Sequence, residues 1–279
     1  MLKKNQVFVI LEGKLFRDYL LYDTEGLDYQ MLDPQYLWLF GLLIGLGAFT
    51  QGFTGIGFGI IVLAGIAFTP WDFERATVVL NLLLLVLNGS IIYASRKEAP
   101  IHWKLVGYIL IGEVFGVPLG YWFILVFGSQ PTFRIVFGVT LALFAANELF
   151  RLRIRKALNM AFGVLAGIIG GFLSGAFTAG GPPIALFVYS RQHDPRLAKG
   201  TLQTVFLSAT IWRLANIILL GKGITLPVMK IAAWTLPILL ICSILGHAAS
   251  RRVSKDMFLK IVFSFILLAG IVNILKGLS

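Results

Sequence analysis

Long apolar runs alternate with short polar connections along most of the chain. The runs lie near residues 37–69, 76–94, 105–127, 135–150, 157–190, 200–220, 225–247 and 257–276. Because an α-helix rises about 1.5 Å per residue, about 20 apolar residues cross the roughly 30 Å core of a bilayer, and most of these runs are long enough. The pattern predicts an all-α integral membrane protein, a polytopic helical bundle.

Two of the runs, 37–69 and 157–190, are too long for one crossing and are interrupted by glycine. Each is therefore predicted to enter the membrane and turn back as a re-entrant or fully spanning hairpin. The first 35 residues differ, because they carry four basic and six acidic side chains and no long apolar run. We expect them to form a polar extension without a signal peptide or a membrane span.

The composition agrees with this pattern. Hydrophobic residues make up 58% of the chain and charged residues 13%, whereas soluble proteins average about 45–50% and about 25%. A single cysteine, Cys242, excludes a disulfide framework. The net charge of +11 would suggest nucleic acid in a soluble protein, but here it has to be placed relative to the bilayer first. We expect no nucleic-acid partner, cofactor or metal site.

The basic residues gather in particular connections. Fourteen lie in four of them, namely Arg96, Lys97 and Lys104; Arg151, Arg153, Arg155 and Lys156; Arg191, Arg196 and Lys199; and Arg251, Arg252, Lys255 and Lys260. Only five lie in the other connections, and one, Arg213, lies inside an apolar run. Cytoplasmic loops of membrane proteins carry an excess of Lys and Arg, so these four connections are predicted to face the cytoplasm.

The two halves of the chain resemble each other at an offset of about 123–126 residues. The matching segments are 52–57 over 175–180, 75–77 over 199–201, 119–120 over 245–246 and 133–137 over 259–263, with Asn147 over Asn273. The alternative is that apolar helices simply look alike. Loop 95–104 is basic and its counterpart near 221 is not, whereas loop 128–134 is poor in basic residues and its counterpart 250–260 is rich. This exchange predicts inverted repeats.

The predicted organisation is thus a polar extension (1–35) and two inverted repeats (36–150 and 151–279), each a glycine-broken hairpin plus three transmembrane helices. The first arm of each hairpin, about 14 residues, would reach about 21 Å and pass the midplane. Non-helical backbone at that depth is tolerated only where it is buried in protein or lines a cavity. The two glycine-rich tips, 51–59 and 174–183, therefore predict a binding site.

The chemistry of the tips indicates an anion. Each tip leads into a helix whose N-terminal N–H groups and dipole favour negative charge, and glycine lets the backbone approach a ligand closely. The candidate substrate-binding residues are Gly52, Thr54, Gly55, Gly57, Asn88, Gly175, Thr178, Gly180, Gly181, Pro182, Gln203 and Arg213. The alternative for the tips is that their glycines only permit tight helix packing.

Two charged residues lie within spans. Arg213 either binds the anion or extends toward the membrane surface, and Glu113 is a proton-coupling candidate, a partner of Arg213 or a structural carboxyl.

The segment GGFLSGAFTAGGPP at 170–183, with a weaker counterpart at 52–59, resembles the TauE/SafE family of sulfite and organosulfonate exporters, which is grouped with toluene-sulfonate uptake permeases. The resemblance covers roughly residues 37–276, and Pro182 departs mildly from the family pattern. It implies a multi-pass secondary transporter of the bacterial cytoplasmic (inner) membrane that exports a sulfur oxyanion such as sulfite, a sulfonate or sulfoacetate by alternating access around a midplane site.

Two other classes remain as alternatives. An anion channel could use the same helix ends. A membrane-embedded enzyme needs clustered catalytic groups, but His102, His193 and His247 lie in or near different loops or helix ends, so we expect no catalytic residues. Proton coupling and homodimerisation are left open by the sequence.

Overall fold

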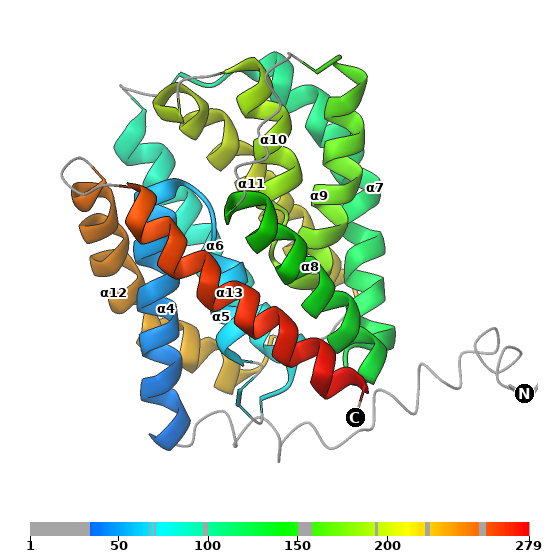
Figure 1. Ribbon diagram of the computed structural model, residues 1–279, viewed down its shortest axis with the longest axis vertical. Helices are drawn as coiled ribbons and strands as arrows, with labels where there is room; N and C mark the ends of the chain where they lie inside the picture. Colours follow the sequence, from blue (N-terminus) through cyan, green and yellow to red (C-terminus); the bar gives the residue numbers. More distant parts are fainter. Residues whose placement is uncertain are drawn as a thin grey trace, which may run out of the picture.

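The computed structural model describes residues 34–278 apart from 67, 70, 97–99, 150–157, 193–194, 221–223 and 251–254. Nearly all of the predicted 1–35 extension, the basic linker 151–156 and His193 lie outside these described residues. Within them the chain forms helices and no strand (Figure 1), which confirms the all-α prediction.

The helices follow the same order twice. Within the described residues, the first series is α4 (Pro34–Thr54), α5 (Phe58–Ile66), α6 (Phe73–Ser95), α7 (Trp103–Phe127) and α8 (Pro131–Leu149). The second series is α9 (Ala161–Phe177), α10 (Gly181–Arg191), α11 (Pro195–Leu219), α12 (Leu226–Ala249) and α13 (Lys255–Leu278). Each series opens with a broken pair, α4–α5 or α9–α10, and continues with three long helices. Helices α4, α6, α7, α11 and α12 are long and apolar enough to cross a membrane.

The first arm of each hairpin is longer than predicted. Instead of about 14 residues, α4 has 21 and α9 has 17, while the return arms α5 and α10 have only 9 and 11. The reason is that Gly52 and Gly175 continue the helices instead of starting the tips. A Cβ at Gly52 would meet the carbonyl oxygen of Ser243 on α12, and one at Gly175 would meet that of Val117 on α7. These two glycines serve close helix packing.

Helices α7 and α9 pack with their backbones in contact. A Cβ at Gly116 or Gly120 of α7 would collide with backbone atoms of α9, and a Cβ at Gly167 or Gly171 of α9 would meet backbone atoms of α7. Small residues at such spacing let helices approach closely in membranes, where no hydrophobic effect drives them together. Helix α4 meets α12 at the opposite side of the bundle (Figure 1).

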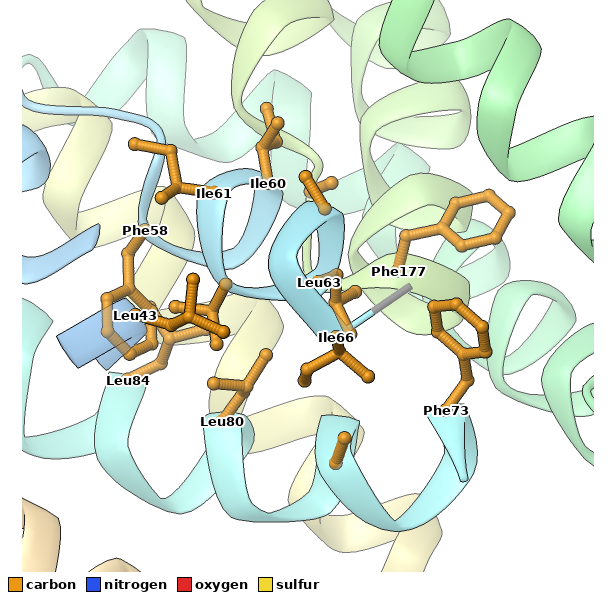
Figure 2. Close-up of a cluster of buried hydrophobic side chains, with 14 of the residues drawn as sticks. Leu43, Phe58, Ile60, Ile61, Leu63, Ile66, Phe73, Leu80, Leu84 and Phe177 are labelled. Carbon is orange, nitrogen blue, oxygen red and sulfur yellow. The ribbon is translucent and has the colours of Figure 1, made fainter. Parts of the chain in front are cut away.

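The short helix α5 is enclosed by protein on all sides, and each of its nine residues is buried. Figure 2 shows its side chains packed against Leu43 of α4, Leu80 and Leu84 of α6, and Phe177 at the end of α9. Of the non-helical residues before α5, Gly55 is buried, and Ile56 and Gly57 are half-buried and line a cavity. Backbone without helical hydrogen bonds is tolerated at membrane depth in such places.

Candidate functional site

A cavity of ≈ 40 Å³ lies where the two hairpin tips meet helices α6 and α11. Its lining residues are Gln51, Ile56, Gly57, Gly59, Ile60, Asn81, Leu84, Asn88, Ser174, Thr178, Ala179, Gly180, Gly181, Phe206, Ala209, Thr210 and Arg213. The tips also touch each other: a Cβ at Gly59 would collide with the carbonyl oxygen of Thr178, and one at Gly181 would lie 3.6 Å from Ile56. The fold thus brings together the two segments that the sequence singled out.

The first tip turns through two left-handed residues. Gly55 has φ +91° and Gly57 has φ +112°, a region that side chains with a Cβ rarely adopt, so glycine is required at both. The hydroxyl of Thr54 closes the turn, because it accepts from the N–H of Ile56 at 3.2 Å and lies 2.7 Å from the carbonyl oxygen of the same residue. Thr54 therefore shapes the tip from outside the cavity lining.

An amide network holds the first tip in place. The side chain of Gln51 accepts from the N–H of Phe58 at 3.2 Å and donates to Oδ1 of Asn88 at 2.8 Å. Gln203 of α11 donates to the carbonyl oxygen of Gly55 at 2.6 Å. Gln51 is a site residue that was not predicted from the sequence, although it is the only amide side chain in the run 37–69 and directly precedes Gly52.

The second tip reaches a similar shape by different means. Thr178, with φ +51°, caps the C-terminus of α9 in the left-handed conformation, whereas Gly180 has φ −69°. Glycine is needed at 180 for space, because a Cβ there would collide with Oγ of Ser174 and the carbonyl oxygen of Gly170. Pro182 lies in the first turn of α10, as predicted, where its missing N–H has no helical acceptor to lose.

Arg213 is buried at the cavity with its guanidinium fixed by neutral oxygens. The side chain is 1% exposed, and Nε donates to the carbonyl oxygen of Gly175 at 2.8 Å. Nη1 and Nη2 donate to the carbonyl oxygen and Oγ1 of Thr77 at 2.8 and 2.7 Å. The alternative in which Arg213 extends toward the membrane surface is therefore wrong. Three of its five N–H donors are used, and none of these three meets a carboxylate.

Glu113 lies outside the cavity lining. It is 2% exposed on α7, and neither of its carboxyl oxygens has a hydrogen-bond partner among the described residues. The predicted alternative that Glu113 pairs with Arg213 is thus wrong in this conformation.

Half of the candidate residues reach the cavity lining. Those that do are Gly57, Asn88, Thr178, Gly180, Gly181 and Arg213, and those that do not are Gly52, Thr54, Gly55, Gly175, Pro182 and Gln203. The second group shapes or supports the tips. The residues that sequence analysis did not select include Gln51, Asn81, Ser174 and Thr210, whose positions depend on how helices far apart in the sequence pack.

Comparisons with known proteins agree with the resemblance noted in the sequence. A family model described as "Sulfite exporter TauE/SafE" matches residues 38–273. The protein described as "Probable sulfite/organosulfonate exporter TauE" from Cupriavidus necator is 28% identical over 241 residues, which cover 81% of this chain and 91% of that protein. No solved structure matches.

Proposed function

Because this chain belongs to the TauE/SafE family of sulfite exporters, and is thus a multi-pass transporter of the inner membrane, we propose that it carries a sulfur oxyanion through the cavity between the two hairpin tips. The observation that carries this proposal is the environment of Arg213. Its hydrogen bonds within the described part of the chain end on neutral oxygens, and Glu74 acts on it electrostatically. Burial of a guanidinium in such surroundings is costly, and an anion in the adjoining cavity would offset that cost.

Further donors around the cavity suit an oxyanion. Asn81 and Asn88 of α6 line the cavity, and although each amide nitrogen donates to Thr210, it has a second N–H. Gly180 and Gly181 supply N–H groups where α10 begins. The first N–H groups of a helix have no acceptor within it, and they favour negative charge. Arg213 has N–H groups left for two oxygens of one sulfur centre, which makes charge-assisted contacts.

The size and walls of the cavity support a compact head group. A volume of ≈ 40 Å³ exceeds the roughly 10–15 Å³ that one water needs, so the space fits a few water-sized groups. Sulfite and the sulfonate group have this scale. The apolar side chains of Ile60, Leu84 and Phe206 face the same space and would contact the carbon part of a small sulfonate.

Antiparallel pairing of matching helices supports alternating access between inverted repeats. Helices α6 and α11 hold equivalent places in the two series. Thr77 contacts Arg213 and Asn81 contacts Thr210, so residue numbers rise along α6 as they fall along α11, and the two helices run in opposite directions. Equivalent helices of two halves lie antiparallel when the second half is inverted in the membrane, and inverted repeats rock around a central site in many transporters.

Helices α8 and α13 give a second example of the same relation. Gly138 lies against Ile274, and Gly277 lies against Ile135, so residue numbers rise along one helix as they fall along the other. Two independent pairs of equivalent helices are therefore antiparallel, which supports the inverted arrangement of the two repeats.

Transport in liposomes tests the proposal. Purified protein should take up radiolabelled sulfite in a saturable way, and unlabelled sulfite trapped inside should accelerate uptake by counterflow. Arg213→Gln should abolish most of this uptake, whereas Arg191→Gln, which removes an exposed arginine on α10, should retain it. Flux that rises linearly with concentration and shows no counterflow would indicate a channel and overturn the carrier mechanism.

A further inference from the structure

The carboxyl group of Glu113 is buried on α7 without a partner. Neither Oε1 nor Oε2 accepts a hydrogen bond from any described residue, and the side chain is 2% exposed. A carboxylate ion in an apolar interior without a partner costs far more free energy than the neutral acid. In this conformation the group therefore carries a proton.

Arg213 is the cation placed to respond to that proton. The described ionisable side chains on helices that contact α7 are Arg134 on α8 and Lys199 and Arg213 on α11, and those on α7 itself are Lys104, Tyr108, Glu113 and Tyr121. Helix α6 packs against α11, and its Glu74 also acts on Arg213 electrostatically. Helix α9 carries none. Arg134 lies over the ring of Phe73, and Lys199 donates to the carbonyl oxygen of Gly52 at the end of α4.

The surface of α9 joins Glu113 to Arg213. A Cβ at Gly171 would lie 3.0 Å from Cα of Glu113, and the carbonyl oxygen of Gly175 accepts from Arg213. These two glycines are one helical turn apart, about 6 Å along the axis. Arg213 also lies 5.5 Å from the ring of Tyr121, which is two turns after Glu113 on α7. Glu113 and Arg213 are thus one to two helical turns apart along the contact between α7 and α9, and pairing of the two side chains requires a rearrangement.

We infer that Glu113 is a proton-binding site coupled to the anion site, so that one proton binds together with each anion; this rests on the function proposed above. In the anion-free protein at neutral pH, a deprotonated Glu113 pairs with the guanidinium of Arg213 in an arrangement that differs from the described conformation, and this pairing competes with the anion. The described conformation, in which Glu113 carries a proton and the hydrogen bonds of Arg213 end on neutral oxygens, is the one that the anion selects. By linkage the effect is reciprocal: the proton strengthens anion binding, and the anion strengthens proton binding.

Proton counting on the purified full-length protein tests the coupling. The probe is methanesulfonate, because a sulfonate does not titrate near neutral pH, so any proton taken up from solution binds to the protein and not to the ligand. The wild type should take up about one proton per anion bound, and its affinity should fall by up to about tenfold per unit rise in pH. Glu113→Gln should bind without proton uptake and keep its affinity across the pH range.

Asp72→Asn is the matched control, because it neutralises the N-cap of α6 and asparagine caps equally well. It should behave as the wild type. Proton uptake that persists in Glu113→Gln overturns the inference while leaving the anion site standing. Absence of saturable binding of both methanesulfonate and sulfite by the wild type overturns the proposed site and the coupling with it.

A measurement on the wild type alone covers the case in which Glu113→Gln does not fold. Infrared difference spectra recorded as methanesulfonate binds at neutral pH should gain the C=O band of a protonated carboxyl group. Binding without that band overturns the inference.

Discussion

Replacement of Arg213 separates a ligand role from a structural one. Arg213→Gln removes the positive charge from the cavity and with it a charge-assisted contact to the anion, worth about 1.5–3 kcal/mol. Each 1.4 kcal/mol is a factor of ten, so affinity for sulfite should fall about 10- to 150-fold. Arg213→Lys keeps the charge but cannot make a bidentate contact, and it should recover affinity only in part.

Stability changes as well, so the assay has to distinguish the two effects. Glutamine cannot donate to the carbonyl oxygen of Gly175 and to both oxygens of Thr77 at once, and a buried acceptor left without a donor costs about 1–3 kcal/mol. A lower melting temperature alone therefore says nothing about the ligand. The informative quantity is the added stability from sulfite, about 2.7 kcal/mol at 100 times Kd and only about 1.4 kcal/mol if Kd rises tenfold.

Thr77→Val supplies the matched control. It removes the hydroxyl that accepts from Nη2 of Arg213 but leaves the charge in place. It should lower the melting temperature while sulfite affinity stays within about threefold of the wild type. The reasoning fails if Arg213→Gln melts at a lower temperature than the wild type yet binds sulfite within twofold of it, because Arg213 would then only hold the tip of α9 to α6.

The remaining predictions concern the tips and the orientation of the chain. Gly57→Leu and Gly180→Leu should insert into the membrane but show no sulfite binding in calorimetry. Leucine at 57 is strained at φ +112°, and leucine at 180 collides with the carbonyl oxygen of Gly170. Gly107→Leu is the control and should bind normally, because a Cβ at 107 has no neighbouring atom within 4 Å. In a Cys242→Ser background, cysteines at positions 153 and 196 should react with an impermeant thiol reagent only from the cytoplasm and one at position 129 only from outside. Labelling of 153 and 196 from the periplasm would refute the predicted topology.

The apolar pattern predicted the helices well for a physical reason. In a bilayer the backbone has to satisfy its own hydrogen bonds, so a long apolar run has few options besides a helix. The run 105–127 became α7 (Trp103–Phe127), and the run 225–247 became α12 (Leu226–Ala249). The hairpin arms were mispredicted because Gly52 looks the same in sequence as Gly55, although one packs against Ser243 and the other turns the chain.

Part of the site could be predicted because its residues stand out in the sequence, and the rest depends on how distant helices pack. Repetition of GFTGIG as GAFTAG indicated both tips, and Arg213 is the basic residue that lies farthest from the ends of an apolar run. Two hydrogen bonds of the site join helices that are far apart in the chain. Gln51 of α4 donates to Asn88 of α6, and Asn81 of α6 donates to the carbonyl oxygen of Thr210 on α11. Single amides in apolar runs give no sign of which partner they will meet.

The contact between α4 and α12 has a consequence for how the protein is made. Gly52 rests against Ser243, which belongs to a helix that begins about 170 residues after α4 ends. At about 5–20 residues per second, α12 leaves the ribosome on the order of 10–30 s after α4. During that interval two parts of the first half lack their final partners. Gly52 lacks Ser243, and the amide of Asn81 lacks the carbonyl oxygen of Thr210. Newly inserted helices therefore have to wait in the membrane, shielded by lipid or by the insertion machinery, until the second half arrives to enclose them.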